Sequence, residues 1–266
     1  MRFQAPRLRV CLSVVLLVFG FSFLPVRVSA DHEIEETKEA IAKSIRKTFD
    51  DFNNDDYLGF IDGFTDLGFL NKKLFAMHVE TPVPKDEIAV FFGAMKLKGP
   101  VTVRNLSNIR ILDHAMVQAT AEIEIQQGHV RERYGLWMVK RLGLDKRYKI
   151  EKDVRLPLFP DGFPVVDVRL TEHKIEFDKN PMARDMVLKI ANAGTIAHEL
   201  IVFHKVMPAD WEDSVGRGAR ELKPGETADL VLTGLDPGEY AMVCCRVDAD
   251  SKPHCDKGER TEFSIN

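Results

Sequence analysis

Apolar residues in the N-terminal part of the chain recur at helical spacing. Within residues 34–54 they lie three or four positions apart with charged residues between them, at Ile41, Ile45, Phe49 and Phe52. This spacing puts the apolar side chains on one face and predicts a long amphipathic helix. Short helical turns are predicted after it, in the Phe- and Gly-rich residues 57–77 and in residues 85–95.

From residue 99 the apolar positions alternate with polar ones, the pattern of a strand with one buried face. Four such runs follow one another with turn residues between them: 101–112, 116–125, 130–140 and 147–154. They predict a four-stranded antiparallel sheet. Helices followed by a curved sheet give an α+β layout, in which one face of the sheet covers the long helix.

Residues 156–164 contain three prolines and one glycine, a composition that excludes regular structure and predicts a linker. The linker is short and stiff, so the parts on either side are expected to touch. Six β-patterned runs follow it: 165–177, 186–192, 198–206, 227–232, 239–244 and 261–265. They predict an all-β Greek-key sandwich. Residues 207–220 are predicted to form an insertion with a helical turn.

The first 30 residues have the layout of a secretory signal peptide. Three arginines precede an apolar run over residues 10–24, and Val28, Ser29 and Ala30 provide small residues at the cleavage spacing. The run of about fifteen residues is shorter than the roughly 20 that span a bilayer. An exported protein, periplasmic or secreted, is therefore predicted to begin near Asp31, with no stable membrane span after cleavage.

The charge of the chain limits its partners. Removal of residues 1–30 takes away four arginines and leaves 33 basic against 41 acidic residues, a net charge of about −8. This balance argues against nucleic acid or an anionic membrane surface as a partner. Three cysteines remain in the mature chain, Cys244, Cys245 and Cys255, and an odd count in an exported protein leaves one thiol that needs a role.

In residues 34–155 a long first helix precedes strands that end in Leu-Trp-Met-Val-Lys (136–140) and Tyr-Lys-Ile (148–150). This arrangement resembles the NTF2-like (SnoaL-like) superfamily and predicts a domain over residues 31–155. It implies helices on a curved antiparallel sheet around a cone-shaped pocket that binds a ligand, or a domain that forms a homodimer. No catalytic motif of that family can be carried over to this chain.

The candidate chemistry lies in the last quarter of the chain. His198 follows a predicted turn, and Cys244 and His254 flank a predicted loop. Two imidazoles and a thiolate suit copper in either oxidation state. Tyr240, Met242 and Cys244 alternate along one strand face, so Cys244 is favoured over Cys245 as the residue that points to the site.

Residues 165–266 contain three motifs: Asn192-Ala193-Gly194 before His198-Glu199-Leu200, Pro237-Gly238-Glu239-Tyr240 before Cys244, and His254 before Gly258-Glu259. With these motifs the segment resembles the cupredoxins, the small blue-copper proteins. It implies His198, Cys244 and His254 as ligands of one copper ion that cycles between Cu(I) and Cu(II). Glu259 stands where the family usually has an axial methionine, and a carboxylate there is a harder donor that favours Cu(II).

With Cys244 as the ligand, Cys245 is free to pair with Cys255 in a disulfide that holds the loop. The segment around Cys255 also resembles the plant phytocyanins, in which the cysteine after the ligand histidine is disulfide-bonded. His173 and His204 are interpreted as structural or surface residues. The alternative to a metal site is a sandwich without metal, in which the three cysteines form a disulfide and one buried thiol.

Three functions remain open at this point. The leading hypothesis is an exported copper protein that carries electrons to or from a redox partner protein. The second is copper storage, delivery or sensing with a copper-handling partner. The third is a metal-free cupredoxin scaffold, with a ligand-binding or dimerising NTF2-like domain. An enzyme is the least supported, because a nitrite-reductase-like reaction needs a second copper site that the sequence does not supply.

Overall fold

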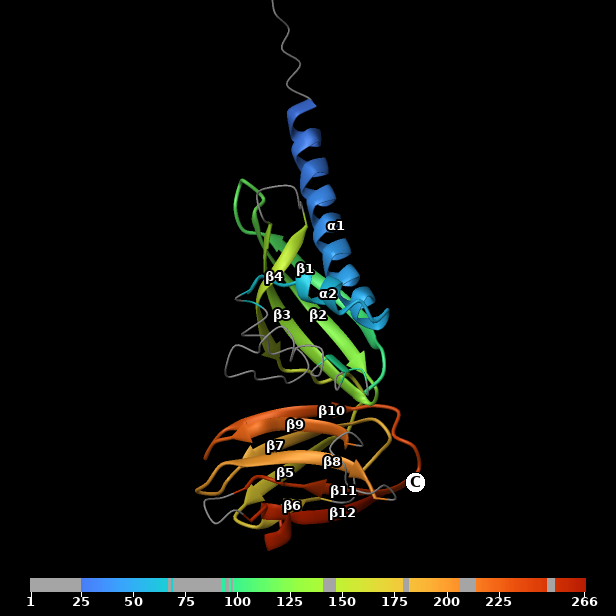
Figure 1. Ribbon diagram of the computed structural model, residues 1–266, viewed down its shortest axis with the longest axis vertical. Helices are drawn as coiled ribbons and strands as arrows, with labels where there is room; N and C mark the ends of the chain where they lie inside the picture. The colour runs from blue at the N-terminus through green and yellow to red at the C-terminus, as the bar shows by residue number, and fades with distance from the viewer. Residues whose placement is uncertain are drawn as a thin grey trace, which may run out of the picture.

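The computed structural model describes residues 25–66, 68, 92–93, 96, 98–140, 147–178, 182–205, 214–247 and 252–266. These residues form two stacked parts, one with a long helix on a sheet and the other a β-sandwich (Figure 1). No helix in the described part of the chain is long and apolar enough to cross a membrane. Residues 1–24 of the predicted signal peptide lie outside the described residues, as do residues 69–77 and most of residues 85–95, where helical turns were predicted.

The predicted long helix is confirmed as α1 (Pro25–Asn53). Its buried face carries the apolar positions of the sequence pattern, with Ile41, Ile45, Phe49 and Phe52 at most 1% exposed. The short helix α2 (Tyr57–Asp62) follows it, and the side chain of Asp56 caps α2 by accepting a hydrogen bond from the N–H of Gly59. Helix α1 packs against the sheet that comes next, and α2 packs against α1 and adds Phe60 to the same apolar core.

The predicted four-stranded antiparallel sheet is confirmed. It contains β1 (Val101–Ile111), β2 (Gln118–Gln127), β3 (Val130–Lys140) and β4 (Tyr148–Leu156), each paired with the next along the chain. Alternate residues of β2 and β3 are buried, and they form one apolar core with α1. Alternation of apolar and polar residues therefore gives the observed register.

The predicted β-sandwich is confirmed for the second part. One of its layers contains β5 (Val165–Thr171), β6 (Lys174–Phe177), β7 (Met186–Asn192) and β10 (Thr227–Leu232). The facing sheet contains β8 (His198–His204), β9 (Ser214–Leu222), β11 (Gly238–Val243) and β12 (Arg260–Ile265). An apolar core fills the space between the two layers.

Strand β9 corrects one prediction. Residues 214–220, expected in an insertion with a helical turn, form a strand that pairs with β8. Two glycines in this stretch hide its β pattern, because glycine is unfavourable in strands. The structure needs them: a Cβ at Gly216 would lie 2.8 Å from Val130, and one at Gly218 would lie 2.1 Å from Ile190.

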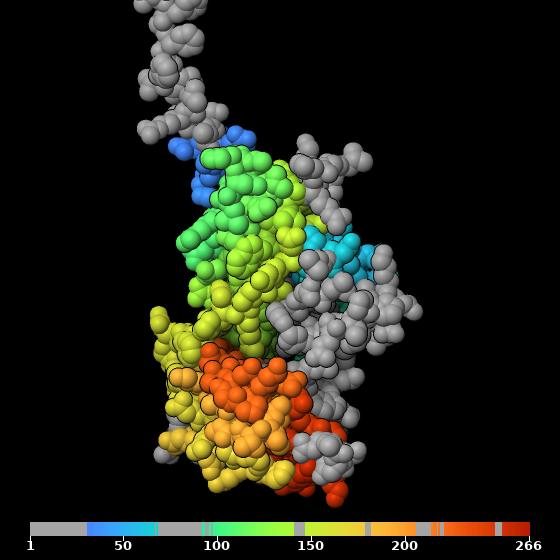
Figure 2. Space-filling view, turned by 90° about the vertical axis from the view of Figure 1, so that its left-hand side faces the viewer, coloured from blue at the N-terminus to red at the C-terminus, as the bar shows by residue number. Residues whose placement is uncertain are grey.

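The two parts share a sheet, which goes beyond the predicted contact between them. Strand β3 pairs with β10, so an eight-stranded sheet runs through both parts in the described chain. Across the junction, Arg155 donates hydrogen bonds to the carbonyl oxygens of Gly218 (2.9 Å) and Asp229 (2.8 Å). Figure 2 shows the two parts in contact. Residues 157–164 contain no helix or strand, as the sequence predicts.

Candidate metal centre

His198 is the first residue of β8 and follows a turn held by Asn192. The side-chain amide of Asn192 donates to the carbonyl oxygens of Ile196 (2.7 Å) and Leu222 (2.8 Å), and its oxygen accepts the N–H of Gly194 (2.9 Å). Gly194 lies directly against the imidazole, because a Cβ there would be 2.9 Å from Nε2 of His198. The Asn-Ala-Gly motif therefore brings the ring to a fixed place at the start of the strand.

Cys244 follows β11 and continues the alternation of that strand. Tyr240 and Met242 point into the core between the sheets, whereas Ala241 and Val243 point to the opposite face. Cys244 falls on the side of Tyr240 and Met242, and its Sγ accepts the N–H of Glu199 at 3.4 Å. Cys244 therefore lies on the same face as Tyr240 and Met242, as the alternation along the strand predicts.

His254 and Glu259 lie on one tightly connected segment. His254 begins the 3₁₀ helix η3 (His254–Lys257), and its N–H donates to the carbonyl oxygen of Arg246 at 2.8 Å. Gly258 ends η3 with φ 102°, a left-handed conformation that favours glycine. The N–H of Glu259 then donates to the carbonyl oxygen of His254, and the N–H of Cys244 to that of Glu259, both at 3.1 Å.

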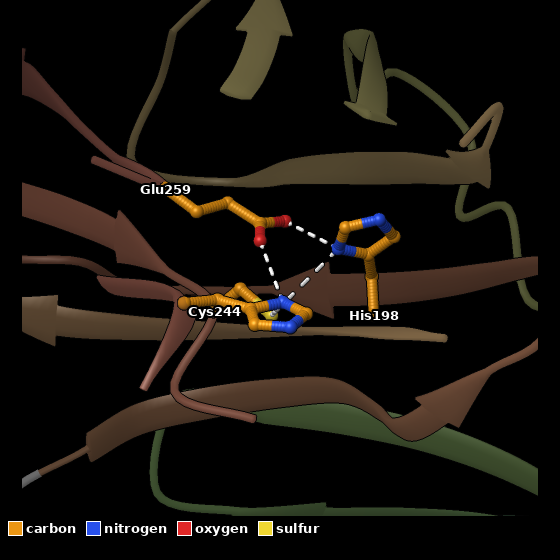
Figure 3. Close-up of side chains that lie close together, drawn as sticks. His198, Cys244 and Glu259 are labelled. Carbon is orange, nitrogen blue, oxygen red and sulfur yellow. Dashed lines mark hydrogen bonds and ion pairs between the residues drawn. The ribbon is translucent and has the colours of Figure 1, made fainter. Parts of the chain in front are cut away.

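The four predicted site residues meet in the interior of the second part. Sγ of Cys244 lies 3.4 Å from Nδ1 of His254 and 4.0 Å from Nδ1 of His198. The carboxyl oxygens of Glu259 lie 2.7 Å from Nδ1 of His198 and 2.9 Å from Nδ1 of His254 (Figure 3). The four donor atoms lie within 4.8 Å of one another, and none of the four residues is exposed.

Two side chains of this cluster carry buried polar atoms that no hydrogen bond satisfies. Among the described residues, Nε2 of His198 has no partner, and the two oxygens of Glu259 meet only the Nδ1 atoms of the two histidines, as ion-pair contacts. A buried polar group without a partner costs about 1–3 kcal/mol, so the arrangement needs a positive charge between the carboxylate and the ring nitrogens. Protonated imidazoles would supply this positive charge. A metal cation would supply it too, and would also bind the thiolate of Cys244. The set of two nitrogens, one sulfur and one oxygen fits copper or zinc.

Burial has the largest effect on the pKa of the Cys244 thiol. It raises the pKa of Cys244 to about 12, against the lowering effect of hydrogen bonds from the N–H groups of Glu199 and Arg246, and the nearby Glu259 raises it further. The thiol therefore keeps its proton at neutral pH in the metal-free protein. A metal must displace that proton to bind the sulfur.

Comparison with known proteins gives matches among solved structures alone. No family model matches the chain, and no curated protein sequence matches it. Auracyanin from the photosynthetic bacterium Roseiflexus castenholzii is 16% identical over 38% of this chain and 96% of its own length, with a TM-score of 0.30. Auracyanin A, a "blue" copper protein from Chloroflexus aurantiacus, is 15% identical over 38% of this chain and 99% of its own, with a TM-score of 0.28. The multicopper oxidase McoA from Aquifex aeolicus is 13% identical over 55% of this chain and 44% of its own, with a TM-score of 0.27.

The disulfide predicted between Cys245 and Cys255 is absent, since both residues are free thiols in the structure. The two side chains are nevertheless hydrogen-bonded to each other and pack on an apolar cluster with Ile201 and Phe203. Burial raises the pKa of Cys245 above its ordinary range. Disulfide formation proceeds through a thiolate, so the raised pKa of Cys245 slows it.

Of two residues near the site, Glu172 was not singled out from the sequence, and His173 was interpreted as a structural or surface residue. Glu172 and His173 form the turn between β5 and β6, inside a run that was predicted as continuous strand. The ring of His173 lies 5.9 Å from that of His254, centroid to centroid and perpendicular to it. His173 is exposed and His204 packs against Tyr240, so both agree with their interpretation as structural or surface residues. In the sequence, the adjacent polar residues Glu172 and His173 are the only signal for the turn between β5 and β6.

Proposed function

We propose that this protein binds one copper ion through His198, Cys244, His254 and Glu259 and passes single electrons to and from a redox partner protein. The observation that carries the proposal is the convergence of these four donor groups in the buried interior, with the two oxygens of Glu259 directed at the Nδ1 atoms of both histidines. Bound copper supplies a change of one electron between Cu(I) and Cu(II). The role of the chain is to hold the donors in one arrangement for both states.

The donor set favours copper over zinc. Structural zinc sites are dominated by cysteine, and catalytic zinc sites keep one position open for water or substrate. Here one cysteine joins two imidazoles, and the complete burial of all four residues gives a substrate no access to the site. Nitrogen, oxygen and sulfur donors also bind Cu(II) more tightly than other divalent metals of the first transition row. Electron transfer requires no open position, so a buried site suits it.

The proposal extends to the rest of the chain. It takes residues 165–266 as a cupredoxin domain and residues 31–155 as an NTF2-like domain, which docks a partner or forms a homodimer. Support for the second assignment comes from α1 packed on the antiparallel sheet β1–β4. It takes residues 1–30 as a signal peptide for export, on the pattern of charged, apolar and small residues at the N-terminus.

Metal analysis and voltammetry test the proposal. The mature protein, purified without metal and titrated with Cu(II), is expected to bind one equivalent and to give a reversible one-electron wave with the metal retained in both states. Rapid loss of Cu(I) to a chelator, with no reversible wave, would favour copper storage or delivery. Failure to retain any copper would contradict both functions and leave the metal-free scaffold.

A further inference from the structure

The turn between β5 and β6 lies against both imidazoles of the candidate centre. Thr171 pairs with Lys174, so Glu172 and His173 alone form the turn, and both are exposed. His173 has φ 61°, and its ring packs edge-on against His254. The turn comes from the opposite sheet of the sandwich to His198, so its contacts link the two sheets at the site.

Glu172 is fixed beside the turn that precedes His198. Its Oε1 accepts hydrogen bonds from the hydroxyl of Thr195, at 2.8 Å, and from the N–H of the same residue. These bonds, the N–H first, lower the pKa of Glu172 to about 2, with the smallest contribution from the nearby His198. The side chain is therefore a carboxylate at neutral pH. It is held by Thr195, which lies three residues before His198.

Gly194 leaves a space that the carboxylate and the imidazole share. The position that a Cβ of residue 194 would occupy lies 2.9 Å from Oε1 of Glu172 and 2.9 Å from Nε2 of His198. That Nε2 is buried and has no hydrogen-bond partner among the described residues. The carboxylate of Glu172 therefore lies on the Nε2 side of the His198 ring, across the space that Gly194 leaves open.

We propose that Glu172 is a positioning residue for His198, whose Nε2–H it accepts as a hydrogen bond. The proposal rests on the proposed function in one respect, namely that Nδ1 of His198 faces the metal. An imidazole that uses Nδ1 as a ligand carries its proton on Nε2, and a carboxylate on that proton fixes the tautomer and the orientation of the ring. Glu259 approaches Nδ1 and Glu172 lies beyond Nε2, so the two carboxylates act on opposite nitrogens of one ring.

Substitution of Glu172 tests the proposal, with Glu176 on the same hairpin as a matched control. Glu172→Leu removes the acceptor and Glu172→Gln keeps a neutral one, while Glu176→Leu removes a carboxylate that pairs with Lys174 away from the site. Loss of a partner to a ligand histidine typically weakens metal binding about 10- to 100-fold. We expect a loss of that size in Cu(II) affinity for Glu172→Leu, a smaller one for Glu172→Gln, and none for Glu176→Leu.

Nitrogen-15 NMR of the metal-free protein gives a second readout that does not depend on copper. The Nε2–H proton of His198 is expected to resonate downfield and to exchange slowly in the wild type and in Glu176→Leu. In Glu172→Leu it should move upfield and exchange faster. An unchanged Nε2–H signal in Glu172→Leu overturns the proposal, as does unchanged copper affinity in that variant. If the wild type binds no copper, the proposed function fails and the NMR result still decides the role of Glu172.

Discussion

Glu259 places Oε1 2.7 Å from Nδ1 of His198, in a site where neither side chain reaches solvent. The other oxygen of Glu259 lies 2.9 Å from Nδ1 of His254, so one carboxyl group spans both imidazoles. One buried carboxyl group thus contacts both histidines of the candidate centre.

Substitution of Glu259 by methionine is expected to raise the reduction potential of the copper-loaded protein. A thioether is a softer and neutral donor, so it destabilises Cu(II) relative to Cu(I). A tenfold change in the ratio of the two affinities corresponds to about 59 mV for one electron, and a rise of at least this size is expected by voltammetry. Glu262→Met, on the exposed side of β12, serves as the control. A potential that is equal in the wild type and Glu259→Met would exclude Glu259 as a ligand.

The metal-free protein is expected to lose stability at alkaline pH because of Cys244. The folded protein holds this thiol proton up to a pKa of about 12, whereas the unfolded chain releases it near the ordinary value of 9.0. The unfolded state therefore binds fewer protons above pH 9, and the free energy of unfolding falls as the pH rises towards the folded pKa. Urea unfolding at pH 9 and pH 11 should show a fall about 2 kcal/mol larger in the wild type than in Cys244→Ser. Equal falls in the two proteins would contradict the raised pKa.

Much of the fold follows from the sequence because burial dictates the pattern. The spacing of Ile41, Ile45, Phe49 and Phe52 predicts α1, and the period-two runs predict β1 to β4 and the sandwich. The turn motif before His198 and the strand alternation at Cys244 also predict that both residues belong to one site. Both patterns depend on local backbone geometry.

The parts that escaped prediction depend on contacts between distant segments. Strand β9 contains Gly216 and Gly218, which are needed for packing on the opposite sheet and weaken its β pattern. The pairing of β3 with β10 joins segments about 100 residues apart, and no local pattern signals it. The approach of Glu172 to His198 likewise depends on the packing of two sheets around Gly194.

Arg155 is expected to hold the two parts of the protein together. Its guanidinium reaches Glu132 at 3.3 Å as well as the carbonyl oxygens of Gly218 and Asp229, and Glu132 is almost fully buried. Removal of one partner of such a buried pair is strongly destabilising, so Arg155→Ala should lower the free energy of unfolding by about 3 kcal/mol.

Chemical denaturation of Arg155→Ala beside Arg104→Ala checks this expectation. Arg104 bonds to Gln126 on the exposed surface of the first sheet, and its loss should change stability by less than about 0.5 kcal/mol. Similar stabilities for the two variants would show that the junction does not depend on the Arg155 contacts.

His173 is expected to slow the release of copper. Its exposed ring covers His254, a residue with no exposed surface of its own. His173→Ala should therefore open the edge of His254 and speed the transfer of Cu(II) to a competing chelator, whereas His173→Phe keeps the ring and the wild-type rate. Lys174→Ala, one residue further on, is the control. Stopped-flow release that is as slow in His173→Ala as in the wild type would refute the covering role.

The absorption spectrum of the Cu(II)-loaded mature protein tests the central claim most directly. Cys244 is the one cysteine of the candidate centre, and a thiolate bound to Cu(II) gives an intense charge-transfer band in the visible region. The account predicts this band in the wild type and in Cys245→Ser, and its complete loss in Cys244→Ser. A wild-type protein without the band, or a band of the same intensity in Cys244→Ser, would contradict a copper centre built on His198, Cys244, His254 and Glu259.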